Sequence, residues 1–195
     1  DQTEFKDVTY WLNLKKILLW STKNVTSTLF SCWGVAAALK AFYDIDIIFR
    51  QDKLSGIYDV ELSSKIDTLT RGFDDVFKAP ISRYCDFPLD IINETTDINV
   101  LASSKDVGLY LGVSGNGKQV YVSGHPEYDV DTLDQEYHRD LAANKSPNIP
   151  INYYPDNDPN KAPLCSWRGH SSLLFCNWLN YYVYQETPYD PYQSK

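Results

Sequence analysis

The sequence predicts an α/β fold in which a cysteine lies at the corner between a strand and a helix. The β-branched and apolar run over residues 25–30 is typical of a buried strand, and Cys32 follows it directly. Apolar side chains then recur at helical spacing over 35–42. Further along, residues 109–113 and 119–122 alternate around a Gly-containing loop, which predicts a β-hairpin.

The remaining segments are consistent with one domain covering residues 1–195. Apolar residues at helical spacing predict a helix over 7–20. Residues 44–107 mix short apolar runs with turn residues, so we expect strands and loops there. Thr132-Leu133-Asp134-Gln135 has the pattern of a capping box that begins a helix.

Near the C-terminus the chain changes character twice. Residues 144–165 are rich in Pro, Asn and Asp, which predicts a long loop. The aromatic stretch 172–184 predicts a closing helix or strand.

Composition excludes several classes of function. The net charge of −8, without a Lys/Arg cluster, argues against nucleic acid as a partner. Apolar runs fall short of the roughly 18 residues that a membrane span needs, and no leader pattern appears, so we expect a cytoplasmic protein. The four cysteines form no CxxC pair and are expected to be reduced thiols. No His/Cys/Asp cluster has metal-ligand spacing, so neither a metal nor a bound cofactor is expected.

Cys32 is the candidate nucleophile. A cysteine at the start of a helix lies where main-chain N–H groups and the helix dipole favour an anion, and hence a thiolate. Gly34 lets the helix approach the strand closely at a sharp turn, as in the nucleophile elbow of hydrolases. The alternative interpretation is a buried, inert cysteine.

His125 is the candidate general base, and Glu127 is its candidate orienting group. A thiol nucleophile needs a base, and the base needs a partner for its other ring nitrogen. Glu127 follows His125 across a proline at the end of a predicted strand, which puts the carboxylate within reach. The alternative is an exposed turn histidine with an incidental acid nearby. His138, on the predicted helix, and His170, in a predicted loop, are less suited.

Several motifs together resemble the homoserine O-acyltransferase family, in its succinyl- and acetyl-transferring branches. The similarity runs over essentially the whole chain. The segments that carry it are 27–34 (STLFSCWG), 53–56 (KLSG), 71–75 (RGFDD), 123–129 (SGHPEYD) and 177–184 (NWLNYYVY). The resemblance implies a class I glutamine amidotransferase-like three-layer α/β sandwich, with the N-terminal part of the family's full chain absent here. Since the sequence contains no Met, we expect a companion N-terminal segment, and we also expect a homodimer.

The resemblance also assigns roles to residues. It implies that Cys32 forms an acyl-thioester, with His125 as base and Glu127 as its support. The main-chain N–H of Trp33 would be one oxyanion donor, and Asp1 would bear on the choice of acyl donor.

Substrate contacts are implied at four further positions, Lys53, Ser82, Arg139 and Glu136. A guanidinium can hold an amino acid's carboxylate through two hydrogen bonds, which suits Arg139. Glu136 could accept the α-ammonium. Without the family, Arg139 would read as an exposed helix charge paired with Glu136 at i, i+3.

The reaction implied is transfer of an acyl group from acyl-CoA, as co-substrate, to the hydroxyl of L-homoserine by a ping-pong mechanism in methionine biosynthesis. Acetyl is favoured over succinyl, because a carboxylate at Asp1 would repel succinyl's free carboxylate. Three alternatives remain open: a serine O-acetyltransferase of the same family, a glutamine amidotransferase-type cysteine hydrolase, and an inactive interaction module.

Overall fold

The computed structural model describes residues 4–63 and 66–188. Its centre is a six-stranded sheet with the strand order β1-β6-β5-β4-β2-β3. The strands are β1 (Thr28–Ser31), β2 (Ile48–Leu62), β3 (Val76–Asp86), β4 (Asn99–Ser104), β5 (Gly108–Ser114) and β6 (Gln119–Val122). β1 and β6 pair in parallel, whereas the other pairings in this sheet are antiparallel.

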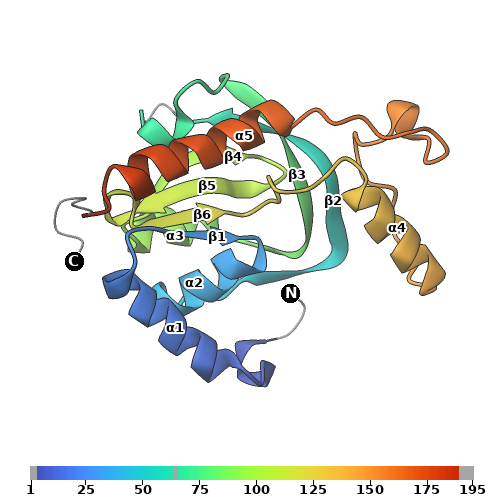
Figure 1. Cartoon of the computed structure of the whole chain (residues 1–195). Coiled ribbons are helices and arrows are strands. Elements are labelled where there is room, and N and C mark those ends of the chain that lie inside the picture. The colour runs from blue at the N-terminus through green and yellow to red at the C-terminus, as the bar shows by residue number, and fades with distance from the viewer. Residues whose placement is uncertain (1–3, 64–65, 189–195) are drawn as a thin grey trace, which may run out of the picture.

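Helices cover both faces of this sheet (Figure 1). The α-helices are α1 (Trp11–Asn24), α2 (Trp33–Tyr43), α3 (Leu89–Thr95), α4 (Thr132–Ala142) and α5 (Arg168–Asn177), and a π-helix (Trp178–Tyr184) continues α5. Short 3₁₀ turns occur at Phe5–Asp7, Thr68–Thr70, Gly115–Gly117 and Pro155–Asn157. In Figure 1, α1 and α2 lie on one side of the sheet, α5 crosses the other side, and α4 stands beyond β2 and β3.

The two faces of the sheet bury separate apolar clusters. β6 shows the division most simply, because its residues alternate between faces as a strand requires. Tyr121 packs in the cluster that contains Leu39 of α2. Its neighbours Val120 and Val122 pack in the cluster that contains Leu174 of α5. The result is a helix–sheet–helix sandwich of three layers.

A third, smaller cluster attaches α4 to the edge of the sheet. Leu133 of α4 packs there with Ile57 of β2 and with the buried Trp167. The loop after α4 also lies against β2, where the Ile57 N–H donates to the Ile151 carbonyl at 2.7 Å. Gly56 allows this approach: its φ is +141°, and a Cβ there would lie 2.3 Å from the Ile151 oxygen.

Most of the predicted elements are confirmed, with shifted ends. The strand predicted over 25–30 is β1, and the predicted hairpin is β5–β6. The helix predicted over 7–20 begins at Trp11 and continues to Asn24, and the aromatic stretch 172–184 is helical. The prediction of a capping box that begins at Thr132 was wrong, because the N-cap of α4 is Asp131, and the Asp131 side chain accepts no hydrogen bond from a main-chain N–H of the helix.

Candidate active site

Cys32 lies at the carboxyl end of β1, between that strand and α2. Its N–H donates to the Val122 carbonyl of β6 at 2.9 Å, which extends the parallel pairing by one residue. The backbone then turns sharply, with φ +48° and ψ −112° at Cys32. Such a conformation costs a non-glycine residue on the order of 1–3 kcal/mol and is typical of functional corners. The predicted strand–cysteine–helix elbow is therefore present.

The parallel pairing of β1 and β6 brings His125 to the same edge of the sheet as Cys32. The chain leaves β6 at Val122, and the His125 N–H donates to the Pro80 carbonyl at 2.9 Å. Gly124 is needed for this course, because a Cβ there would lie 2.7 Å from both the Pro80 oxygen and the Ile81 side chain. The thiol of Cys32 is close enough to the imidazole to raise the pKa of His125.

Glu127 holds the other side of the imidazole. Its Oε1 lies 2.7 Å from Nδ1 of His125, so Nε2 is left for the sulfur, as the sequence interpretation expected. Burial disfavours the imidazolium, but the hydrogen bonds to Cys32 and Glu127 outweigh burial and raise the pKa of His125 to about 9. At neutral pH this ring is therefore held as the charged form beside the sulfur.

The other thiols lack such an environment. All four cysteines are free, as expected. Cys85 is fully buried on β3, and burial raises the pKa of its thiol to about 11, which disfavours a reactive thiolate.

Lys53, Ser82 and Glu136 meet in a polar cluster next to Cys32. Oε2 of Glu136 accepts from Lys53 Nζ at 2.8 Å and from Ser82 Oγ at 2.5 Å. Burial opposes ionisation of Glu136, but Lys53, Ser82 and Tyr128 outweigh it, so the pKa of this carboxyl is lowered. The Ser82 carbonyl lies 3.8 Å from the sulfur of Cys32, so the cluster adjoins the thiol.

Arg139, predicted to hold a carboxylate, lies outside this cluster. Its guanidinium contacts Asp140 at 3.2 Å, and its side chain is 64% exposed. Arg139 is thus paired with Asp140 and not with Glu136, so the alternative of an i, i+3 surface pair with Glu136 does not describe this structure. Trp33 is the first residue of α2, where main-chain N–H groups have no partner within the helix. Asp1 lies outside the described residues.

Two neighbours of the cluster were missed by the sequence analysis. Tyr128 stacks on His125 and donates to Oε1 of Glu136 at 2.6 Å. Asp140 is buried, and its Oδ2 lies 3.7 Å from Lys53 Nζ. Asp140 follows Glu136 at i+4, a spacing that places both carboxylates on one helix face and could have indicated it.

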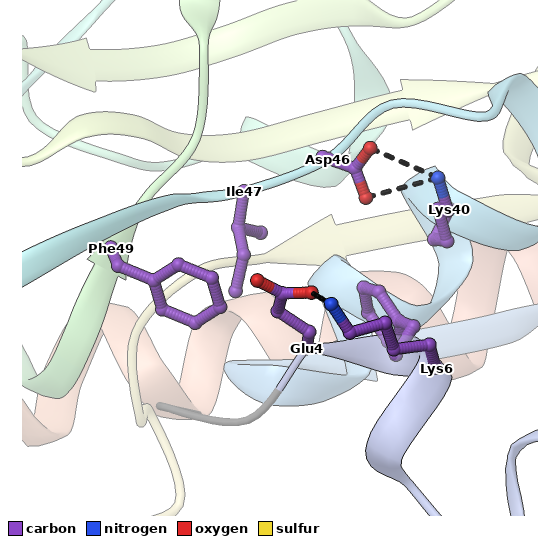
Figure 2. Close-up of a pocket in the computed structure, with 7 residues that line it drawn as sticks. Glu4, Lys6, Lys40, Asp46, Ile47 and Phe49 are labelled. Carbon is purple, nitrogen blue, oxygen red and sulfur yellow. Dashed lines mark hydrogen bonds and ion pairs between the residues drawn. The ribbon is translucent and has the colours of Figure 1, made fainter.

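A pocket elsewhere in the molecule is less suited than the surroundings of Cys32 to be the active site. A pocket of about 420 Å³ lies away from the thiol, and Figure 2 shows its residues, Glu4, Phe5, Lys6, Lys40, Asp46, Ile47 and Phe49. Its cations are neutralised by acids, since Lys6 pairs with Glu4 and Lys40 with Asp46. Within the described residues, no group of three or more His, Cys, Asp or Glu side chains could hold a metal ion, and no helix could cross a membrane.

Comparisons with known proteins agree on a family. The family model for homoserine O-succinyltransferase matches residues 1–189. A homoserine O-acetyltransferase from Succinatimonas hippei is 57% identical over 97% of this chain and 63% of its own length. Homoserine O-succinyltransferases from Photorhabdus laumondii and Tolumonas auensis are 54% and 56% identical, over 96% of this chain and 60% and 59% of theirs. The chain thus spans about three-fifths of the length of these relatives.

Solved structures agree on the fold. A glutamine amidotransferase from Thermotoga maritima superposes with a TM-score of 0.66 at 17% identity, over 92% of this chain and 72% of that one. Another, from Methylobacillus flagellatus, gives 0.63 at 10% identity, over 89% and 70%. The glutamine amidotransferase-like α/β sandwich expected from the resemblance is therefore confirmed.

Proposed function

The chain belongs to the homoserine O-succinyltransferase family, and from this premise we propose that it carries an O-acyltransferase site built on Cys32. An acyl group would pass from acyl-CoA to Cys32 and then to the hydroxyl of L-homoserine, a reaction of methionine biosynthesis. The observation that supports this most directly is the series of interacting side chains from Cys32 through His125, whose pKa Cys32 raises, to Glu127, which is hydrogen-bonded to His125.

In the first half-reaction, the Cys32 thiolate attacks the thioester carbonyl of acyl-CoA. The carbonyl electrons move to oxygen, and main-chain N–H groups at the start of α2, including that of Trp33, would stabilise the oxyanion. The C–S bond to CoA then breaks, and His125 donates its proton to the departing CoA sulfur. A protonated ring suits this step, and the raised pKa of His125 supplies it.

In the second half-reaction, His125 must act as a base. Once Cys32 is a thioester, its sulfur carries no charge, so Cys32 no longer raises the pKa of His125, whereas Glu127 still raises it and burial still lowers it. The pKa of the ring is therefore lower than it is beside a thiolate, so the ring stays neutral after giving up its proton and is available to accept the proton of the homoserine hydroxyl. The hydroxyl oxygen attacks the thioester, and the Cys32 thiolate leaves.

The polar cluster next to the sulfur is the proposed acceptor site. Glu136 is held ionised by Lys53 and Ser82 and can receive an α-ammonium. Arg139 is mostly exposed on the same helix, with its guanidinium available to turn toward a carboxylate. These roles rest on the family resemblance together with this arrangement.

The acyl donor is the finer question. The charge of Asp1 favours acetyl, whereas the matching relatives carry both names and most of those compared are named succinyltransferases. We propose to decide it by comparing kcat/KM for acetyl-CoA and succinyl-CoA in the full chain and in Asp1→Gly. A preference for succinyl-CoA in the unmutated protein would overturn the acetyl assignment.

Mass spectrometry of the full chain tests the proposed function itself. Incubation with acyl-CoA should add one acyl group, mapped to Cys32 and discharged by L-homoserine. Cys32→Ser should abolish the thioester adduct, while Cys176→Ser, which alters an exposed thiol, should leave it intact. An adduct on Cys85, discharge by serine in preference to homoserine, or ammonia release from glutamine without acyl transfer would each reject the assignment.

A further inference from the structure

Tyr128 connects the two parts of the site that the preceding proposal treats separately. Its ring is stacked on the imidazole of His125, with centroids 4.1 Å apart and an interplanar angle of 18°. Its hydroxyl donates to Oε1 of Glu136 at 2.6 Å. One side chain therefore touches both the proposed base and the proposed acceptor carboxylate.

The backbone of Tyr128 is fixed as firmly as its ring. Its N–H donates to the His125 carbonyl at 3.1 Å, which closes the turn between the two residues. Its carbonyl accepts from the indole Nε1 of Trp167 at 3.1 Å, and Trp167 is fully buried. Tyr128 thus cannot shift without breaking contacts at three points, two in the main chain and one at the hydroxyl.

The hydroxyl has a defined place on Glu136. Lys53 and Ser82 both donate to Oε2, whereas Tyr128 donates to Oε1. The Tyr128 hydroxyl therefore helps to set the rotation of the carboxylate, while the main-chain bonds of Tyr128 hold its ring on His125.

We propose that Tyr128 is a positioning residue that holds the His125 imidazole in the plane where Nε2 faces Cys32, and that it ties this orientation to Glu136. A tyrosine face also attracts a cationic ring, so stacking stabilises the imidazolium and, through it, the thiolate. The roles of His125 and Cys32 in this inference rest on the proposed function, but the stacking acts on the thiol whatever group the enzyme transfers.

Alkylation of Cys32 by iodoacetamide tests the inference without any acyl substrate. The rate is followed from pH 6 to pH 10 in the full chain, and peptide mapping separates Cys32 from the exposed Cys176. Tyr128→Leu removes the ring, and we expect its rate at pH 7 to fall by about three- to thirtyfold, which is the range for losing a partly desolvated cation–π contact. At pH 10, which lies above the ordinary pKa of a thiol, the rate should stay within about twofold of that of the unmutated protein.

Tyr128→Phe separates the ring from the hydroxyl. It keeps the stacking, so its alkylation profile should match that of the unmutated protein, while KM for homoserine should rise because Glu136 loses a donor. Tyr137→Leu, on α4 next to Glu136, is the matched control and should leave the alkylation profile unchanged. If Tyr128→Leu does not fold, Tyr128→Met fills the same space without an aromatic face and decides the point.

The possible results are distinct. An unchanged alkylation profile in folded Tyr128→Leu or Tyr128→Met overturns the inference, and so does an equal loss in Tyr128→Phe. Absence of an acyl adduct in the unmutated protein, with the alkylation pattern as expected, rejects the proposed transferase but leaves the positioning role supported.

Discussion

Glu127→Gln is the sharpest perturbation of the proposed triad. The change removes one charge at 2.7 Å from Nδ1 of His125 and keeps an oxygen that can accept the same hydrogen bond. Two unit charges at that distance attract by about 1.5 kcal/mol in bulk water and about 6 kcal/mol at an effective dielectric constant of about 20. The Glu127 side chain is 47% exposed, so solvent screening favours the lower end, and we take about 2 kcal/mol.

That loss has two measurable consequences. A 2 kcal/mol penalty on the imidazolium in the transition state corresponds to a fall of about thirtyfold in kcat. The pKa of His125 should also move down from its raised value, because a contribution that raises it has been removed. Steady-state turnover and its pH profile measure both effects.

Asp129→Asn is the matched control for this change. It removes one charge from the same turn, but Asp129 makes no contact with the imidazole in the described structure. It should leave kcat within about twofold. Equal losses in both variants, or an unchanged kcat and pH profile in Glu127→Gln, would refute the reasoning.

Three further changes concern stability. Cys32→Gly should be more stable in urea than Cys32→Ser by about 1–2 kcal/mol, because glycine accepts the φ of +48° without strain, and equal stability would count against a strained corner. Gly124→Ala should lower the free energy of unfolding by about 1–3 kcal/mol through overpacking. Gly169→Ala, which has open space around it in α5, should raise the free energy of unfolding by about 0.5–1 kcal/mol. Calorimetric changes of the same sign in both variants would contradict this prediction. The pKa of His125 is raised in the folded state, so protonation of His125 contributes at most about 3 kcal/mol to the free energy of unfolding. This contribution is fully present below pH 6.5 and is lost as the pH rises to about 9. A His125→Gln variant should lose this pH dependence of stability, and an unchanged dependence would contradict the prediction.

The strand–cysteine–helix corner at Cys32 could be predicted because its causes are local. A β-branched run, one cysteine and a helical pattern follow one another in the sequence, and each has a strong local preference. The partnership of His125 with Glu127 is local for the same reason, since only Pro126 separates them. The residues alone could not show that Cys32 and His125 lie close together, because their proximity depends on the parallel pairing of β1 with β6.

The polar cluster of Lys53, Ser82 and Glu136 could not be derived from local patterns. Lys53 lies on β2, Ser82 on β3 and Glu136 on α4, and only tertiary contacts bring them together. The resemblance to a family named these residues, but it gave no reason for Tyr128, whose role depends on a ring contact and a hydrogen bond in three dimensions.

The two parts of the site are held by different cores, and this division bears on the order of the reaction. Cys32, the proposed nucleophile, directly precedes α2, whose apolar side packs in the cluster with Leu39 and Tyr121. α4, which carries Glu136, is held by the separate cluster around Trp167 and by the loop after α4, which lies against β2 at Gly56. In the proposed reaction, formation of the acyl-thioester would use only the first part, whereas its discharge would use both. The proposed ping-pong reaction would divide at the same place, so the proposed acceptor site could vary in sequence without disturbing the strained corner at Cys32.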